Sequence, residues 1–299
     1  MKITGLHLLL SYTCTSECDH CFVWGSPETP GVMSLSQIRE LLREAAIYGA
    51  VDFIYLEGGE PFLFYPIMVK AAEEAKKVGF KVGIVTNAYW ATSQVNAEEW
   101  LRPLVGIDDL SASADLYHCD VIAAPEVQRA VRAARKLSIP VNILSAIPPG
   151  EKGEKLTIAG VEVGYCGLMY KGRAAVRLAV ERAKTHWEEF TTCPCEDFER
   201  QERVHIDPLG FVHVCQGIAI GNVNGQPLSE MLSRYQPRDN PILRLLLEAG
   251  PVGLVKEFVV PHGEKYADAC HLCYEARLHL RGRFPHILAP GQMYGAGLG

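Results

Sequence analysis

The sequence predicts an α/β protein: an open, partial (β/α)6 barrel followed by a small C-terminal α+β domain. In the first half, short apolar runs alternate with amphipathic stretches, the pattern of strand–helix units around a parallel sheet. The strands begin about every 20 to 50 residues, and six are too few to close an eight-stranded barrel. After Gly172 the composition shifts to cysteines, glycines and short β-prone pieces. We therefore place the barrel at residues 1–172 and the second domain with the C-terminal tail at 173–299.

Six apolar segments are the predicted strands of the barrel. They are Leu6–Leu10, Phe53–Leu56, Phe80–Val85, Asp109–Ser113, Val141–Leu144 and Val161–Gly164. A capping box from Ser34 to Gln37 opens the first predicted helix, which ends at Gly49. Apolar stripes predict further helices over residues 68–78, 127–137 and 173–189, and β-prone pieces follow at 203–206 and 211–214. Parallel α/β barrels carry their chemistry on loops after the carboxyl ends of strands, so we expect the site there.

Composition and charge exclude several classes of protein. Hydrophobic residues make up 48% and charged residues 21% of the chain, which is ordinary for a folded domain. The net charge of −6 leaves no broad basic surface for a nucleic-acid backbone. No apolar run approaches the roughly 18 residues that a membrane span needs, and the N-terminus lacks a signal-peptide core. We expect a cytoplasmic protein without a nucleic-acid or membrane partner.

Ten cysteines are the unusual feature of this composition, and three of them lie directly after the first predicted strand. Cys14, Cys18 and Cys21 have CX3CX2C spacing within one loop. In a cytosolic chain such cysteines are more often metal ligands than disulfides. A [4Fe-4S] cluster held by three thiolates keeps one iron open to another ligand. The alternative is a zinc site, although zinc usually takes paired CX2C knuckles with two further ligands.

The triplet resembles the signature of the radical S-adenosylmethionine (radical SAM) superfamily, in which an aromatic residue, here Phe22, follows the third cysteine. The resemblance implies a TIM-like partial (β/α)6 barrel, a [4Fe-4S] cluster at the triplet and S-adenosylmethionine bound to its open iron. Gly58, Gly59 and Glu60 look like the family's GGEP motif, which receives the methionyl ammonium of the cofactor. Asn87, Ser111 and Ser113 are similar to positions that line the cofactor and substrate cleft.

The cysteines of the second half fit a second cluster. Cys195, Gly210 and Cys215 match the opening of the twitch and SPASM domains that many enzymes of this superfamily carry, and Cys270 and Cys273 supply two further ligands. The resemblance implies one auxiliary [4Fe-4S] cluster in a twitch-like domain. A structural zinc on the same four thiolates is the alternative. Cys193 lies two residues from Cys195, but its distance to Gly210 falls outside the pattern.

The resemblance implies reductive cleavage of S-adenosylmethionine to a 5′-deoxyadenosyl radical, which abstracts hydrogen from a small-molecule substrate. An electron donor such as flavodoxin or ferredoxin is then required. One alternative is modification of a peptide or protein, by epimerisation or cross-linking, with leader recognition by a separate protein. The triplet lies too near the first residue for a preceding peptide-recognition domain. A third alternative is a non-catalytic iron-sulfur or zinc protein.

Two single cysteines remain. Cys119 and Cys166 are most simply small buried hydrophobes. Because they lie near the ends of the fourth and sixth strands, either is also a candidate hydrogen donor to a substrate radical.

Overall fold

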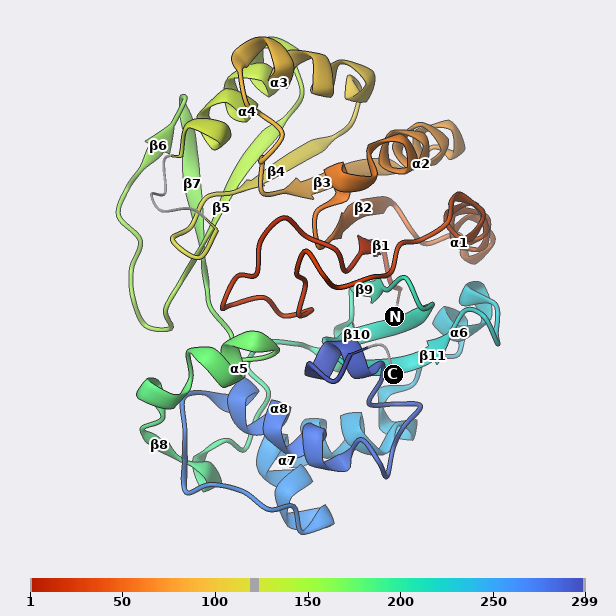
Figure 1. The fold of residues 1–299 in the computed structure, drawn as a ribbon. Helices are drawn as coiled ribbons and strands as arrows, with labels where there is room; N and C mark the ends of the chain where they lie inside the picture. Colours follow the sequence, from red (N-terminus) through yellow and green to blue (C-terminus); the bar gives the residue numbers. More distant parts are fainter. Residues whose placement is uncertain (1, 119–123, 298–299) are drawn as a thin grey trace.

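The computed structural model describes residues 2–118 and 124–297. Its main feature is a ten-stranded sheet in the order β11-β10-β9-β1-β2-β3-β4-β5-β7-β6 (Figure 1). The barrel strands are β1 (Gly5–Ser11), β2 (Phe53–Gly58), β3 (Lys81–Thr86), β4 (Asp109–Ser113), β5 (Val141–Ile147), β6 (Thr157–Ile158) and β7 (Val161–Gly167). All neighbours from β1 to β7 in this order pair in parallel, and β6 pairs antiparallel with β7. The six predicted strands and the α/β partial barrel are confirmed.

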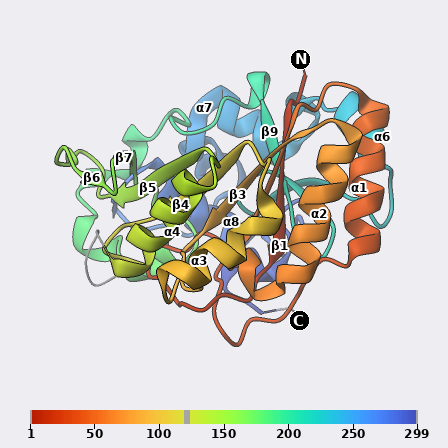
Figure 2. The same ribbon diagram turned by 90° about the horizontal axis from the view of Figure 1, so that it is seen from above.

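Four helices cover the outside of this sheet, as Figure 2 shows from above. They are α1 (Leu35–Tyr48), α2 (Tyr65–Val78), α3 (Gln94–Leu101) and α4 (Pro125–Lys136), with the short helices η1 (Pro61–Phe64) and η2 (Arg102–Leu104). Ser34 caps α1 in the predicted capping box, and Gly49 ends it in the left-handed conformation. Between β5 and β7 the chain forms a loop and the short strand β6 in place of the fifth helix of a regular strand–helix repeat.

The two faces of the parallel strands differ in chemistry. One register row holds Leu8, Leu56 and Ile84, which are all completely or almost completely buried. The neighbouring row holds His7, Tyr55 and Asp109 on the opposite face. Side chains alternate between faces along a strand, so the apolar row packs under the helices while the polar row faces the barrel interior. The interior is therefore equipped for binding rather than only for packing.

The second half begins with a short helix where a long one was predicted. Its elements are α5 (Arg173–Arg177), η3 (Val180–Arg182), β8 (Thr185–His186), η4 (Trp187–Glu189), η5 (Phe198–Arg200), β9 (Arg203–Ile206), β10 (Phe211–Cys215), β11 (Ile218–Asn222), α6 (Leu228–Ser233), η6 (Pro237–Asp239), α7 (Pro241–Phe258), β12 (Lys265–Tyr266), α8 (Ala269–Leu280) and η7 (Gly291–Tyr294). The predicted helix over 173–189 is wrong, because residues 185–186 are extended and pair with β12 about 80 residues away. A local pattern cannot reveal that pairing.

The sheet continues across the predicted domain boundary. Strand β9 pairs in parallel with β1, and β10 and β11 extend the sheet in antiparallel fashion. Figure 1 shows α5, α7 and α8 on the other side of these strands from the barrel helices. The division at residues 172 and 173 therefore stays a prediction. Within the described residues, no helix is both long and apolar enough to span a membrane.

Candidate functional site

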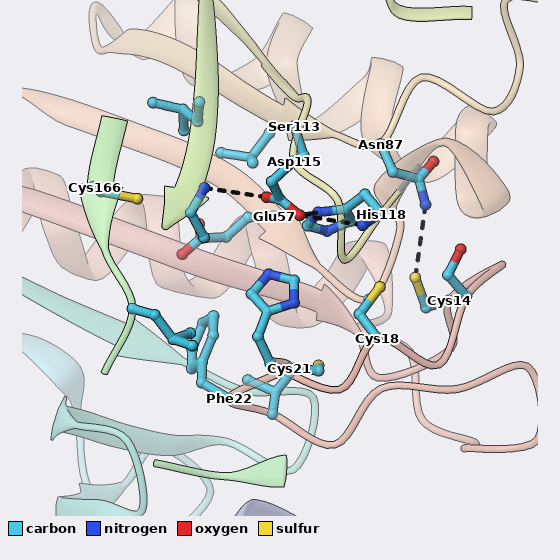
Figure 3. Close-up of a pocket in the computed structure, with 18 of the residues that line it drawn as sticks. Cys14, Cys18, Cys21, Phe22, Glu57, Asn87, Ser113, Asp115, His118 and Cys166 are labelled. Atoms are coloured by element: carbon cyan, nitrogen blue, oxygen red, sulfur yellow. Dashed lines mark hydrogen bonds and ion pairs between the residues drawn. The ribbon is translucent and has the colours of Figure 1, made fainter. Parts of the chain in front are cut away.

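A cavity of about 310 Å³ lies at the carboxyl ends of the barrel strands (Figure 3). It is lined by nine of the residues singled out in the sequence: Cys14, Cys18, Cys21, Phe22, Gly58, Gly59, Asn87, Ser113 and Cys166. We call it the front cavity. The structure thus brings the cysteine triplet, the glycine pair and the ends of four further strands to one place, which is where a parallel barrel is expected to carry its site.

The triplet loop is held from the second half of the chain. Arg173 is almost fully buried and donates from its two terminal nitrogens to the backbone oxygens of Cys18 and Gly25, each at 2.8 Å. The amide of Gln292 donates to the backbone oxygens of Val23 and Trp24, each at 3.0 Å. These bonds fix the loop without using the cysteine sulfurs, so the three sulfurs remain available as ligands.

The thiols themselves fit a metal cluster. Burial raises the pKa of Cys14 to about 11 and that of Cys18 to about 12, so without metal these sulfurs stay protonated at neutral pH. Metal binding must displace those protons. Two N–H groups already point at the sulfurs: the backbone N–H of Gly25 donates to Cys21 Sγ at 3.2 Å, and the side-chain amide of Asn87 to Cys14 Sγ at 3.8 Å. Such donors stabilise thiolate ligands.

The glycine pair lets the end of β2 approach the triplet loop closely. A Cβ at Gly59 would lie 2.0 Å from the backbone oxygen of Thr13, and one at Gly58 would lie 2.5 Å from that of Ser11. Gly58 also has a φ of 135°, which side-chain-bearing residues rarely adopt. Glycine is therefore required here by the packing of backbone on backbone. Both residues are half-buried and line the front cavity.

Glu60 does not line the front cavity, in contrast to its predicted place against the cofactor ammonium. Its side chain is completely buried and accepts hydrogen bonds from Thr86 Oγ1 at 2.9 Å and from the backbone N–H groups of Asn87 at 2.7 Å and Phe62 at 3.1 Å. Burial raises the pKa of this carboxyl to about 7. Because the Glu60 oxygens are already used by these three donors, Glu60 acts by positioning Asn87, which does line the cavity.

Ser111 is likewise outside the cavity. It lies deeper in the barrel and donates to Asp109 Oδ2 at 2.7 Å, an atom that also accepts from Tyr55 at 3.1 Å. Along β4 only every second residue faces the interior, and Ser113, one such step nearer the carboxyl end, is the serine that lines the cavity. Cys119 lies outside the described residues.

Several polar residues of the site were not predicted. Glu57 lines the cavity, and its Oε1 lies 3.0 Å from His7 Nδ1 and 3.2 Å from His205 Nε2, on the strands β1 and β9. These contacts hold the pKa of Glu57 well below its usual range although burial opposes them. Asp115 also lines it and contacts His118 at 2.9 Å. The position of Glu57 directly before the glycine pair was the available signal, whereas the contribution of β9 depends on a long-range pairing.

A second cavity, the rear cavity, gathers the cysteines of the second half. It is lined by Cys193, Cys195, Cys215, Cys270 and Cys273. The sulfurs of Cys195 and Cys270 lie 3.6 Å apart, and burial raises the pKa of Cys193 to about 12 and of Cys273 to about 11. The sequence placed four of the five together. The choice among the five, and the metal that they bind, stay predictions.

The fold and the front cavity define an enzyme of the radical SAM class. A model of the Radical SAM superfamily matches residues 8–158, just over half of the chain, and the chain belongs to this superfamily. Members use a [4Fe-4S] cluster and S-adenosylmethionine, and the free, converging thiols of the triplet fit that cluster.

Among curated proteins, the chain is 24% identical over 201 residues to the "Putative peptide biosynthesis protein YydG" of Bacillus subtilis (strain 168), which covers 63% of each chain. The match thus spans less than two thirds of that relative. Among solved structures, BtrN in complex with AdoMet and 2-DOIA is 14% identical with a TM-score of 0.45, covering 84% of this chain and 91% of that one. Streptococcus suis SuiB bound to precursor peptide SuiA is 15% identical with a TM-score of 0.44, covering 85% and 73%. Likeness of this degree assigns no activity.

Proposed function

We propose that this protein is a radical SAM enzyme that modifies a peptide in the front cavity. The observation that carries the proposal is the shared cavity, in which the three triplet cysteines and Cys166 face one space. The choice of a peptide over a small molecule is supported by the Bacillus subtilis relative, whose name describes a peptide biosynthesis protein. The bound cluster and S-adenosylmethionine supply the carbon radical that removes a hydrogen atom from the substrate.

The residues of the chain divide the remaining tasks. Cys14, Cys18 and Cys21 hold the cluster, and the backbone that lines the cavity at Gly58 and Gly59 receives the polar end of the cofactor. Asn87 is positioned by Glu60 at 2.7 Å and donates to Thr15 Oγ1 at 2.9 Å, which orders the rim beside Cys14. Walls of Phe22 and Leu144 exclude water from the reacting atoms.

Cys166 is the proposed hydrogen donor to the substrate radical. It lines the cavity from β7 and is exposed to it, and partial desolvation of the sulfur raises its pKa, so it stays a thiol with a hydrogen to give. Transfer of that hydrogen leaves a sulfur radical, and one electron from the external reductant with one proton from solvent restores the thiol. This sequence returns hydrogen to the carbon from which it was taken, as epimerisation of a peptide residue requires.

The rear cavity is proposed to hold an auxiliary [4Fe-4S] cluster on Cys195, Cys215, Cys270 and Cys273, within a twitch-like domain over residues 173–299. The support is the convergence of these sulfurs from β10, α8 and the loop before η5. Such a cluster has no open iron, which favours an electron-transfer or structural role over direct binding of substrate.

The test uses reconstituted enzyme, S-adenosylmethionine and a strong reductant in deuterated water. Peptides encoded by short reading frames beside the gene are the substrates, and mass spectrometry reads a gain of one mass unit per modified residue. Deuterium in the peptide that is lost in Cys166→Ala, with 5′-deoxyadenosine still formed, is the expected result. Unlabelled peptide together with a small molecule that stimulates 5′-deoxyadenosine formation would replace the peptide by a small-molecule substrate.

A further inference from the structure

Among the described residues, Lys171 alone lines both the front and the rear cavity. It lies between β7 and α5, directly before Gly172, where the chain passes from the barrel strands to the second half. The residue is only 8% exposed. A lysine is seldom buried to this extent unless other charges compensate for the loss of water.

The compensation comes from the rear cavity. No carboxylate lies within ion-pair distance of the Lys171 ammonium in the described part of the chain. On the front side the ammonium lies 6.0 Å from the ring centre of Phe22, a weak cation–π contact. On the rear side the residue lines the cavity together with Cys215, Cys270 and Glu196. A cluster bound there would place thiolate ligands beside the ammonium, and their negative charge would compensate for its burial.

A second cation lines the same cavity. Arg277 is almost fully buried in α8 and lines the rear cavity, and it donates to the backbone oxygens of Cys273 at 3.2 Å and Gln216 at 2.5 Å. Its guanidinium is therefore fixed by hydrogen bonds. The Lys171 ammonium, in contrast, has no hydrogen bond to a carbonyl among the described residues, so its charge acts on the cavity as a whole. Two buried cations beside five cysteine sulfurs indicate a site that can hold a group with net negative charge.

We propose that Lys171 sets the reduction potential of the cluster in the rear cavity, an inference that rests on the proposed auxiliary cluster. A four-iron cluster on four thiolates carries a net charge of −2 when oxidised and −3 after accepting one electron from an external reductant. A buried ammonium beside it stabilises the more negative state more strongly, because the attraction grows with the charge in a site of low dielectric. No proton moves in this step. Lys171 acts on the cluster through its charge alone.

The test removes the front cluster first. In a Cys14→Ala/Cys18→Ala/Cys21→Ala background, reconstituted protein is titrated with redox mediators while its electron paramagnetic resonance signal is recorded. Lys171→Met and Lys171→Gln are expected to shift the one-electron equilibrium at least tenfold toward the oxidised cluster, about 59 mV. Lys171→Arg keeps the charge and is expected to stay within threefold of the parent. Lys256→Met is the matched control, since Lys256 lies on α7 with a side chain that is 60% exposed.

The outcomes separate the two proposals. Absence of iron from the triple-alanine parent refutes the auxiliary cluster itself. Four irons with an unchanged potential in both neutral variants overturn the role of Lys171 while leaving the cluster in place. Loss of iron from both neutral variants but not from Lys171→Arg shows that the charge is needed to hold the cluster at all, which overturns a role in setting its potential. Loss from all three Lys171 variants assigns the side chain to packing and overturns it.

Discussion

Arg173 donates to the backbone oxygen of Cys18 at 2.8 Å, across 155 residues of sequence. This bond joins the first residue of α5 to the loop that carries the triplet, and a second bond reaches Gly25. Hydrogen bonds from charged groups contribute about 1.5 to 3 kcal/mol each. The second half of the chain therefore determines the shape of the loop that binds the first cluster.

Arg173→Met is expected to destabilise the metal-free protein by about 3 kcal/mol, because two buried carbonyls lose a charged donor. Urea unfolding measures this change, and iron counting is expected to show a depleted front cluster. Arg177→Met is the control, since Arg177 lies one turn further along α5 and is exposed. Equal stability of the two variants would contradict the proposed role of the Arg173 bonds.

Gly59→Ala is expected to prevent the correct approach of β2 to the triplet loop, because its Cβ would overlap the backbone oxygen of Thr13. We expect a loss of about 2 kcal/mol or more in unfolding free energy and a large fall in affinity for S-adenosylmethionine. Gly282→Ala meets no atom within 4 Å and is expected to change stability by about 0.5 kcal/mol or less. A stable Gly59→Ala protein with unchanged cofactor binding would show that the loop has room to move.

The buried carboxyl of Glu60 makes a pH prediction with a defined sign. Its pKa is raised from 4.5 to about 7 in the folded protein, so the folded state binds this proton more tightly than the unfolded state does. The resulting stability is complete below about pH 4.5 and is lost as the pH rises toward 7. Compared with Glu60→Gln, wild-type metal-free protein should lose up to about 1.4 kcal/mol per pH unit over this range.

Urea unfolding of the two proteins at pH 5, 6 and 7 gives this difference. A gap in unfolding free energy that does not vary with pH would mean that Glu60 has an ordinary pKa. For the holoenzyme, Glu60→Gln is expected to weaken S-adenosylmethionine binding through misplacement of Asn87, with the front cluster still assembled. Unchanged affinity would show that the backbone at Gly58 and Gly59 suffices.

The composition of the rear site is tested by iron and zinc counts. About eight irons per chain are expected after anaerobic reconstitution, and about four in Cys270→Ala/Cys273→Ala. Cys193→Ala is expected to keep eight irons per chain, because Cys195 is the proposed ligand. If Cys193 is the ligand instead, Cys195→Ala will keep eight irons. Four irons with one zinc, lost in the double variant, would replace the auxiliary cluster by a structural zinc.

The sequence was most informative where chemistry and structure are both local. The capping box at Ser34, the helix end at Gly49 and the triplet with its glycine pair each depend on a few adjacent residues, and all were predicted in place. Glu60 was assigned to the cavity because a motif shows proximity but not the direction of a side chain. His205 and Lys171 could not be predicted at all, since their places depend on β9 joining β1 and on how the second half packs against the barrel.

The central claim is that the three cysteines after β1 make this protein a radical SAM enzyme, and the most direct measurement is 5′-deoxyadenosine formation under strong reductant. Wild-type protein, reconstituted anaerobically and given S-adenosylmethionine, is predicted to form it. The Cys14→Ala/Cys18→Ala/Cys21→Ala variant is predicted to form none while remaining folded by circular dichroism. Continued formation by the folded triple variant would contradict the assignment of the site.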